Sequence, residues 1–252
     1  MISANLAQNQ VMPKSLPLPL AVIPLLFCVS CAHTTFQYST LSSPDIIKND
    51  RHEFVMENDS LRLIYNFSGK SGPIQITIQN KMGVPVYIDW QRSAMVVNDK
   101  IKPYMQAEMK IKGRFESTSY QTGRYGANNG ELQAIVVHQS TTDFIPPGAV
   151  INKRPMYVSG FNGRIPDTAF HTFKFTVAKG TTVKVKKATF TEVTSPLRFR
   201  SYITYMIGEP GSKSFAFESN FFVSEIMNTG SGPIEMSVNR SNRGDQYYSL
   251  RY

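Results

Sequence analysis

Apolar and polar residues alternate through much of this chain, and this period-two pattern constrains the fold more than any other feature. Leu61, Leu63, Tyr65 and Phe67 fall on one face of an extended segment, and a turn at 68–73 follows them. Successive side chains of a strand point to opposite faces, so such runs are typical of strands with one buried face. No segment repeats every 3.6 residues over three turns. We therefore expect an all-β protein.

Further alternating runs follow, separated by Gly, Pro and Asn turns. The expected strands cover residues 74–78, 84–90, 94–97, 135–137, 144–151, 171–177, 183–185, 197–207 and 215–223. The first strands follow one another through tight loops, which favours antiparallel pairing in an Ig-like β-sandwich. The pattern leaves open whether the strands build one large domain or two small ones.

Composition divides the chain into six expected segments. These are a signal peptide with a lipobox (1–31), a flexible tether (32–52), an Ig-like strand-rich half (53–102), a long polar loop (103–133), a second strand-rich half (134–235) and a polar tail (236–252). A loop as long as the fourth segment is usually functional or disordered. The tail is basic and aromatic, so we expect it to be loosely held. We interpret its Arg243-Gly-Asp245 tripeptide as a chance match to an integrin-binding motif.

The first segment has the properties of an export signal. An apolar run of 14 residues, Leu16 to Val29, follows Lys14 and contains three prolines. As a helix it would span about 21 Å, which is less than the roughly 30 Å of a membrane's hydrocarbon core. A short apolar segment after a positive charge indicates a secretory signal. Met12 is an alternative start to Met1 that gives the signal conventional proportions.

Cys31 is the expected site of lipid attachment. It follows Cys28-Val29-Ser30, which resembles the bacterial lipobox except that Cys28 stands where leucine is usual. Two or more acyl chains on Cys31 would anchor the protein stably in a membrane. The alternative is an ordinary signal that is cleaved nearby, for example after Ala32, and releases a soluble protein. Both cysteines of the chain lie in this segment, so the remainder can form neither a disulfide nor a cysteine metal site.

Net charge is +9 and is unevenly distributed. Residues 171–200 carry seven basic residues against Glu192 alone, among them Lys184, Lys186 and Lys187. Such a surface should prefer anionic partners, although a solvated lysine face is the simpler interpretation. A second candidate binding surface lies in the polar loop, where tyrosines alternate with arginines. Its residues are Tyr104, Tyr120, Arg124 and Tyr125.

Several longer runs carry a resemblance to a known family. They are ITIQNKMGVPVYIDWQRSAMVVND (76–99), FIPPGAVI (144–151), SPLRFRSYITYMIGE (195–209) and FFVSEI (221–226). In pattern and order they resemble an uncharacterised lipoprotein family of Bacteroidetes, with the long loop unmatched. The resemblance implies an envelope location and a β-sandwich, and it implies no activity and no functional residues.

No catalytic constellation emerges from the sequence. Trp90 has the spacing of a core anchor, and the neighbouring Asp89 could pair with Arg92 or cap the following turn. A hydrolase would need a second carboxylate beside Asp89. The four histidines lack metal-ligand spacing, and neither a serine-hydrolase elbow nor a phosphate-binding loop is present. We therefore expect no enzyme activity, no metal, and no cofactor apart from the lipid on Cys31.

The expected function is accordingly broad. The leader predicts a lipid-anchored protein of a bacterial cell envelope, most simply of the outer membrane, that contacts lipid through its acyl anchor. The strand pattern favours a structural or protein-interaction module. The alternative is a module that binds glycan or lipopolysaccharide through the basic region and the tyrosine-rich loop. An exported protein seldom meets nucleic acid, so we expect no nucleic-acid partner.

Overall fold

The computed structural model describes residues 35–105, 110–122, 125–137, 141–158, 165–177, 180–236 and 243–251. Most of these residues lie in strands, which confirms the all-β prediction. In chain order the elements are β1 (Thr35–Ser42), β2 (Ile47–Lys48), β3 (Phe54–Glu57), β4 (Leu61–Asn66), β5 (Gly69–Lys70), β6 (Pro73–Asn80), β7 (Val86–Val97), β8 (Lys100–Pro103), β9 (Lys110–Thr122), β10 (Tyr125–Val137), β11 (Thr142–Ile145), β12 (Val150–Tyr157), a 3-10 helix η1 (Asp167–Ala169), β13 (His171–Thr176), β14 (Thr182–Thr189), β15 (Arg198–Ile207), β16 (Ser214–Thr229), α1 (Pro233–Met236) and β17 (Gln246–Arg251).

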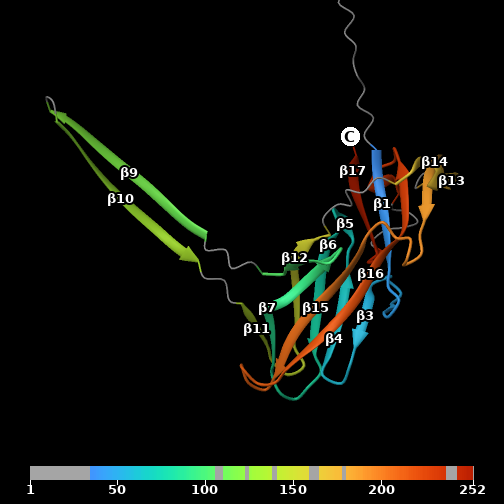
Figure 1. Ribbon diagram of the computed structural model, residues 1–252, viewed down its shortest axis with the longest axis horizontal. Helices are drawn as coiled ribbons and strands as arrows, with labels where there is room; N and C mark the ends of the chain where they lie inside the picture. The colour runs from blue at the N-terminus through green and yellow to red at the C-terminus, as the bar shows by residue number, and fades with distance from the viewer. Residues whose placement is uncertain are drawn as a thin grey trace, which may run out of the picture. The chain divides into compact units, whose positions relative to one another are not determined.

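The described strands form a ten-stranded, a five-stranded and a two-stranded sheet. The ten-stranded sheet has the order β11-β7-β15-β16-β1-β17-β5, with β8 added to β7 and the pair β13–β14 added to β16. Its long strand β16 pairs with β15 through its first half and with β1 and β14 through its second half (Figure 1). The five-stranded sheet has the order β12-β6-β4-β3-β2.

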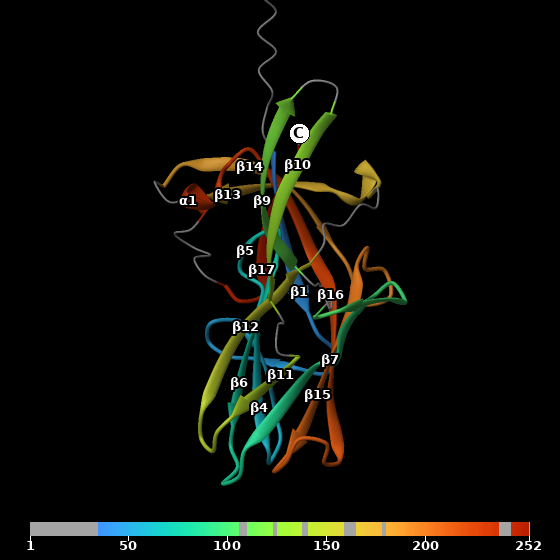
Figure 2. The same cartoon turned by 90° about the vertical axis from the view of Figure 1, so that its left-hand side faces the viewer.

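The two larger sheets share one hydrophobic core. Phe54 on β3 and Phe67, which directly follows β4, contact the ring of Phe221 on β16 at centroid distances of 5.1 and 5.2 Å. Phe199 on β15 lies against the same cluster. These edge-to-face and stacked aromatic contacts fill the space between the sheets, whose strands β4 and β6 lie across from β7 and β15 (Figure 2). Residues from both strand-rich halves thus build the same core.

The expected strands are found, although several are longer than expected, and at two places the division into strands differs. The segments expected at 84–90 and 94–97 form one strand, β7, with an irregularity where Ser93 accepts a hydrogen bond from the backbone of Thr204 at 2.9 Å. The segment at 144–151 is two strands, since Pro146-Pro147-Gly148 turns the chain from β11 to β12. Both strands lie at sheet edges, and the edge position of β12 accommodates its Pro155.

The predictions of a tether at 32–52 and a loose tail at 236–252 are wrong for their described parts. β1 lies between β16 and β17, and Tyr38 and Leu41 are buried. β17 pairs with β1 and, in parallel, with β5. The alternation of apolar and polar residues is not visible in β1, because this strand also buries Gln37. The amide of Gln37 donates to Asn228 at 3.0 Å. A buried polar residue with a partner leaves no apolar signal in the sequence.

The predicted polar loop at 103–133 is also wrong over most of its length. β9 and β10 form an antiparallel hairpin of two 13-residue strands that makes up the two-stranded sheet. Its Gly and Asn content is unusual for strands, which explains why the composition indicated a loop.

Candidate anion-binding surface

The strand pair β13–β14 has two faces of different character. β13 pairs with β14 and β14 pairs with β16, which makes β13 the outermost of the described strands on this side. Cross-strand partners share a face of a sheet, and so do residues two positions apart in one strand. The register therefore assigns every residue of the pair to one face or the other.

One face is anchored in a second, smaller hydrophobic core. Phe175, Val183 and Val185 contribute to it, together with Tyr38 and Met236 from β1 and α1. Burial of these apolar side chains fixes the orientation of the pair, since turning it over would expose them to water. The opposite face is consequently held towards solvent.

At the positions where β13 pairs with β14, the solvent face carries only lysine and threonine side chains. Its members form three cross-strand pairs, Lys174 with Lys184, Thr172 with Lys186, and Thr176 with Thr182. All six residues are exposed. We call them the Lys–Thr face. Each lysine places three donors and each threonine one hydroxyl on the same surface.

The strand register places the three lysines that the sequence predicted to bind an anion on different faces of the sheet. Lys184 and Lys186 lie on the Lys–Thr face, whereas Lys187 lies on the opposite face. The ammonium of Lys187 is 2.5 Å from the carboxylate of Glu225 on β16, which gives it a structural ion pair. Lys174 stands opposite Lys184 instead. The number of charges in the sequence does not identify Lys174 as a binding residue, because strand pairing decides which lysines are neighbours.

Electrostatics makes the Lys–Thr face favourable for an anion. Like charges directly opposite each other on a sheet repel and destabilise the pair. Within the described residues, Lys174, Lys184 and Lys186 form no ion pair that would offset this repulsion. An anion seated between them would relieve it, and the threonine hydroxyls could donate to the same anion.

The structure removes Tyr104 from the predicted tyrosine surface. Its side chain is buried, and its hydroxyl donates to Ser201 Oγ at 2.7 Å. Burial raises the pKa of Tyr104 well above its usual value. The tyrosine follows the edge strand β8 directly and packs against Trp90, with ring centroids 6.2 Å apart. A loop-like composition concealed this core position.

The other members of that surface are placed only in part. Tyr120 lies on β9 opposite Ala127, and Tyr125 lies on β10 opposite Thr122. Arg124 lies outside the described residues, and so do Cys31 and the whole expected signal peptide. Among the described residues, no helix has the length and apolar character needed to cross a membrane.

Trp90 and Asp89 have the structural roles expected from the sequence. Trp90 is 3% exposed, and its indole donates to Asp143 Oδ2 at 2.7 Å. Asp89 Oδ1 accepts from the backbone N of Arg92 at 3.1 Å and its Oδ2 lies 3.6 Å from Arg92 Nε, so Asp89 pairs with Arg92 within β7. No group of three or more His, Cys, Asp or Glu residues in the described part of the chain could hold a metal ion.

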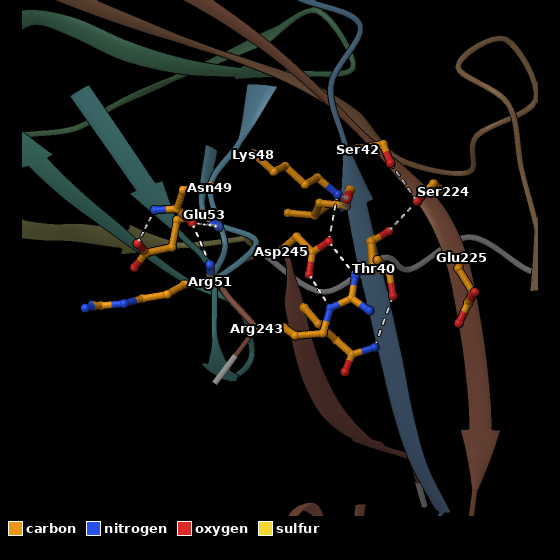
Figure 3. Close-up of polar contacts among 12 residues, drawn as sticks. Thr40, Ser42, Lys48, Asn49, Arg51, Glu53, Ser224, Glu225, Arg243 and Asp245 are labelled. Atoms are coloured by element: carbon orange, nitrogen blue, oxygen red, sulfur yellow. Dashed lines mark hydrogen bonds and ion pairs between the residues drawn. The ribbon is translucent and has the colours of Figure 1, made fainter. Parts of the chain in front are cut away.

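A buried ion cluster escaped the sequence prediction. Asp245, in the tripeptide that we expected to be exposed, has no exposed surface. Lys48 Nζ and Arg243 Nη2 both lie 2.7 Å from its Oδ2, and Arg243 Nε donates to its Oδ1 (Figure 3). Burial opposes the charged carboxylate, but these hydrogen bonds outweigh it and hold the pKa of Asp245 below its usual value. The cluster therefore stabilises the fold and leaves no exposed carboxylate for a partner.

Comparisons of the chain with protein-family models, curated proteins and solved structures find no match.

Proposed function

We propose that this chain is a lipid-anchored protein of a bacterial cell envelope that binds phosphate-bearing lipopolysaccharide through the Lys–Thr face. The anchor rests on the leader and on Cys31. The binding rests on one observation, which is the direct opposition of Lys174 and Lys184 on an exposed face, where the described part of the chain gives them no acidic partner. The two sheets around an aromatic core support the finer proposal of an Ig-like β-sandwich.

Lipopolysaccharide fits this surface because its phosphates are multiply charged and closely spaced. Each lysine near an anionic surface contributes about 1 kcal/mol, so three lysines contribute about 3 kcal/mol. That free energy corresponds to about 100-fold in affinity. An acidic glycan with carboxylates would use the same lysines with weaker charge.

A matched set of variants tests the binding. The full chain, in a neutral detergent, is measured against immobilised lipopolysaccharide. The triple substitution Lys174→Gln, Lys184→Gln and Lys186→Gln should weaken binding about 100-fold. The control triple Lys70→Gln, Lys100→Gln and Lys213→Gln removes the same charge from exposed positions on other strands or turns and should change it less than threefold. Equal losses of affinity in the two triple variants would contradict a localised site, because binding would then depend only on the net charge of the protein.

A structural or protein-interaction role is the competing proposal from the leader and strand pattern. It predicts a reproducible protein partner in pull-downs from detergent-solubilised membranes. It also predicts that the Lys174, Lys184 and Lys186 triple retains that partner. The anionic-ligand proposal requires neither result.

A further inference from the structure

Two adjoining hollows lie over the outer face of β15, on strands other than those of the Lys–Thr face. Their volumes are about 450 and about 270 Å³, and Val96 and Arg200 line both. Small-molecule sites usually measure roughly 300–1,000 Å³. Together the hollows are large enough for a ligand of several rings.

Strand register explains the larger hollow. Two rows of side chains cross β8, β7 and β15, namely Pro103–Ala94–Tyr202 and Ile101–Val96–Arg200. The residues on the middle strand, Ala94 and Val96, are smaller than their neighbours on both sides. A groove therefore runs along β7, with Ile101 and Pro103 as one wall and Tyr202 and Arg200 as the other.

The floor of the groove offers side chains and no backbone edge. β7 pairs with β8 and with β15, and β15 pairs with β7 and with β16, so the backbone donors and acceptors of the floor are used. A peptide that adds itself as a strand needs a free sheet edge. A ligand seated on the floor is therefore recognised by side chains, and only the wall strand β8 has an edge without a described partner.

At the wall of the groove, the exposed ring of Tyr202 lies beside a hydrogen-bond donor, Arg200, and an acceptor, Glu218. Tyr202 is 42% exposed. Glu218 on β16 lies opposite Tyr202, and its Oε1 accepts a hydrogen bond from Arg200 Nη1 at 3.0 Å; the side chains of Arg200 and Glu218 both remain about half exposed. An exposed guanidinium next to a carboxylate matches a hydroxyl group, which donates and accepts at once. The tyrosine ring offers a flat apolar surface to the C–H face of a sugar ring.

The charges around the two hollows balance. The charged residues that line them are Arg92, Arg198, Arg200, Asp99, Glu192 and Glu218. Three cations against three anions favour an uncharged ligand, in contrast to the Lys–Thr face.

We propose that the groove along β7 and β15 binds a short, uncharged oligosaccharide, with Tyr202 stacked on one ring and Arg200 and Glu218 bonded to its hydroxyls. This site is independent of the proposed lipopolysaccharide site, because it uses other strands and another chemistry. Its binding should be unaffected by the Lys174, Lys184 and Lys186 triple substitution.

The test titrates the full chain, in a neutral detergent, with cellohexaose, maltohexaose, mannohexaose and an uncharged hexapeptide. We expect at least one hexasaccharide to bind with a Kd below about 1 mM, and its binding to be insensitive to salt because the ligand carries no charge. Tyr202→Ala should weaken it more than tenfold, whereas Tyr202→Phe, which keeps the ring, should stay within threefold of the parent chain.

A second variant distinguishes loss of the binding site from a folding defect in Tyr202→Ala. Ala94→Leu fills the floor of the groove and keeps every proposed contact residue, so it should also weaken binding more than tenfold. The thermal midpoints of both variants are measured alongside. Binding of no hexasaccharide, equal binding by Tyr202→Ala and the parent chain, or Tyr202-dependent binding of the hexapeptide would each overturn the proposal.

Discussion

The ammonium of Lys48 lies 2.7 Å from the buried carboxylate of Asp245, a residue 197 positions later in the chain. Lys48 belongs to β2 of the five-stranded sheet, and Asp245 immediately precedes β17 of the ten-stranded sheet. The ion pair therefore joins the two sheets. Lys48 also donates to the carbonyl of Leu41 at the end of β1, 2.8 Å away, so one ammonium ties three segments together.

Removing the charge of Asp245 should destabilise the fold. Asp245→Asn leaves Lys48 and Arg243, both largely buried, without their shared counter-ion. We expect a loss of about 3 kcal/mol in the free energy of unfolding, measured by urea titration at pH 7. Asp59→Asn, at an exposed position, is the control and should change stability by less than about 0.5 kcal/mol.

The same carboxylate gives the stability a defined pH dependence. Its pKa is lowered in the folded state, so its contribution is complete above the unfolded value of about 3.9 and is lost as pH falls through the folded value. The free energy of unfolding should decline below about pH 4. Asp245→Asn should decline less steeply over that range, and an unchanged slope would contradict the assigned ion pairs.

Gly244 should tolerate no side chain. A Cβ atom at this position would lie 2.9 Å from the backbone Cα of Glu53, and the glycine carbonyl accepts from Phe67 N at 2.7 Å. We expect Gly244→Ala to lower the thermal midpoint through about 2 kcal/mol of overpacking. Gly230→Ala, where a Cβ atom meets nothing within 4 Å, should be nearly neutral. Equal effects would show that the contact with Glu53 is not formed.

The hydroxyl groups of Tyr65, Tyr104 and Ser201 form a cluster in the core, and substitutions in it should destabilise the fold to different extents. Ser201 Oγ accepts from Tyr104 at 2.7 Å and lies 3.0 Å from the hydroxyl of Tyr65. Tyr104→Phe leaves Ser201 with Tyr65 and should cost about 1 kcal/mol, whereas Ser201→Ala leaves a buried tyrosine hydroxyl without its acceptor and should cost about 2 kcal/mol. Urea unfolding measures both. Tyr157→Phe, at an exposed position, serves as the reference, and a reversed order of the two costs would contradict the network.

The two cysteines give the prediction for the anchor. Cys31→Ser should abolish incorporation of labelled palmitate in an expressing bacterium and release the protein from the membrane fraction, because the acyl chains supply the anchoring free energy. Cys28→Ser should retain both properties. Palmitate labelling that depends on Cys28, or membrane retention by Cys31→Ser, would contradict the assignment of Cys31.

The sequence predicts strands well where one face is buried and poorly where both faces carry partners. β4 and β6 follow the alternation of Leu61 to Phe67 and of Ile74 to Ile78. β1 buries both Tyr38 and the polar Gln37, and β17 buries Tyr247 and Gln246 beside each other. Their side chains are satisfied by hydrogen bonds that form only in the assembled sheet, so no local pattern identifies them.

Binding residues are harder still to predict, because they depend on register. Lys186 and Lys187 are neighbours in sequence, yet β14 turns them to opposite faces, and only Lys187 meets Glu225. Lys174 is ten residues from Lys184 and becomes its direct neighbour through pairing. Tyr104 was placed on a surface by the composition around it, although its hydroxyl lies in the core beside Ser201.

The most direct test of the proposed lipopolysaccharide binding combines removal of the three lysine charges with removal of the phosphates that they are proposed to contact. The parent chain and the Lys174, Lys184 and Lys186 triple variant are each titrated against lipopolysaccharide before and after removal of its phosphates. If the lysines bind the phosphates, each change alone should weaken binding about 100-fold and the two together no further, because both remove one interaction. Losses that multiply when the changes are combined would show that the lysines contact something other than phosphate, and would contradict the proposed function.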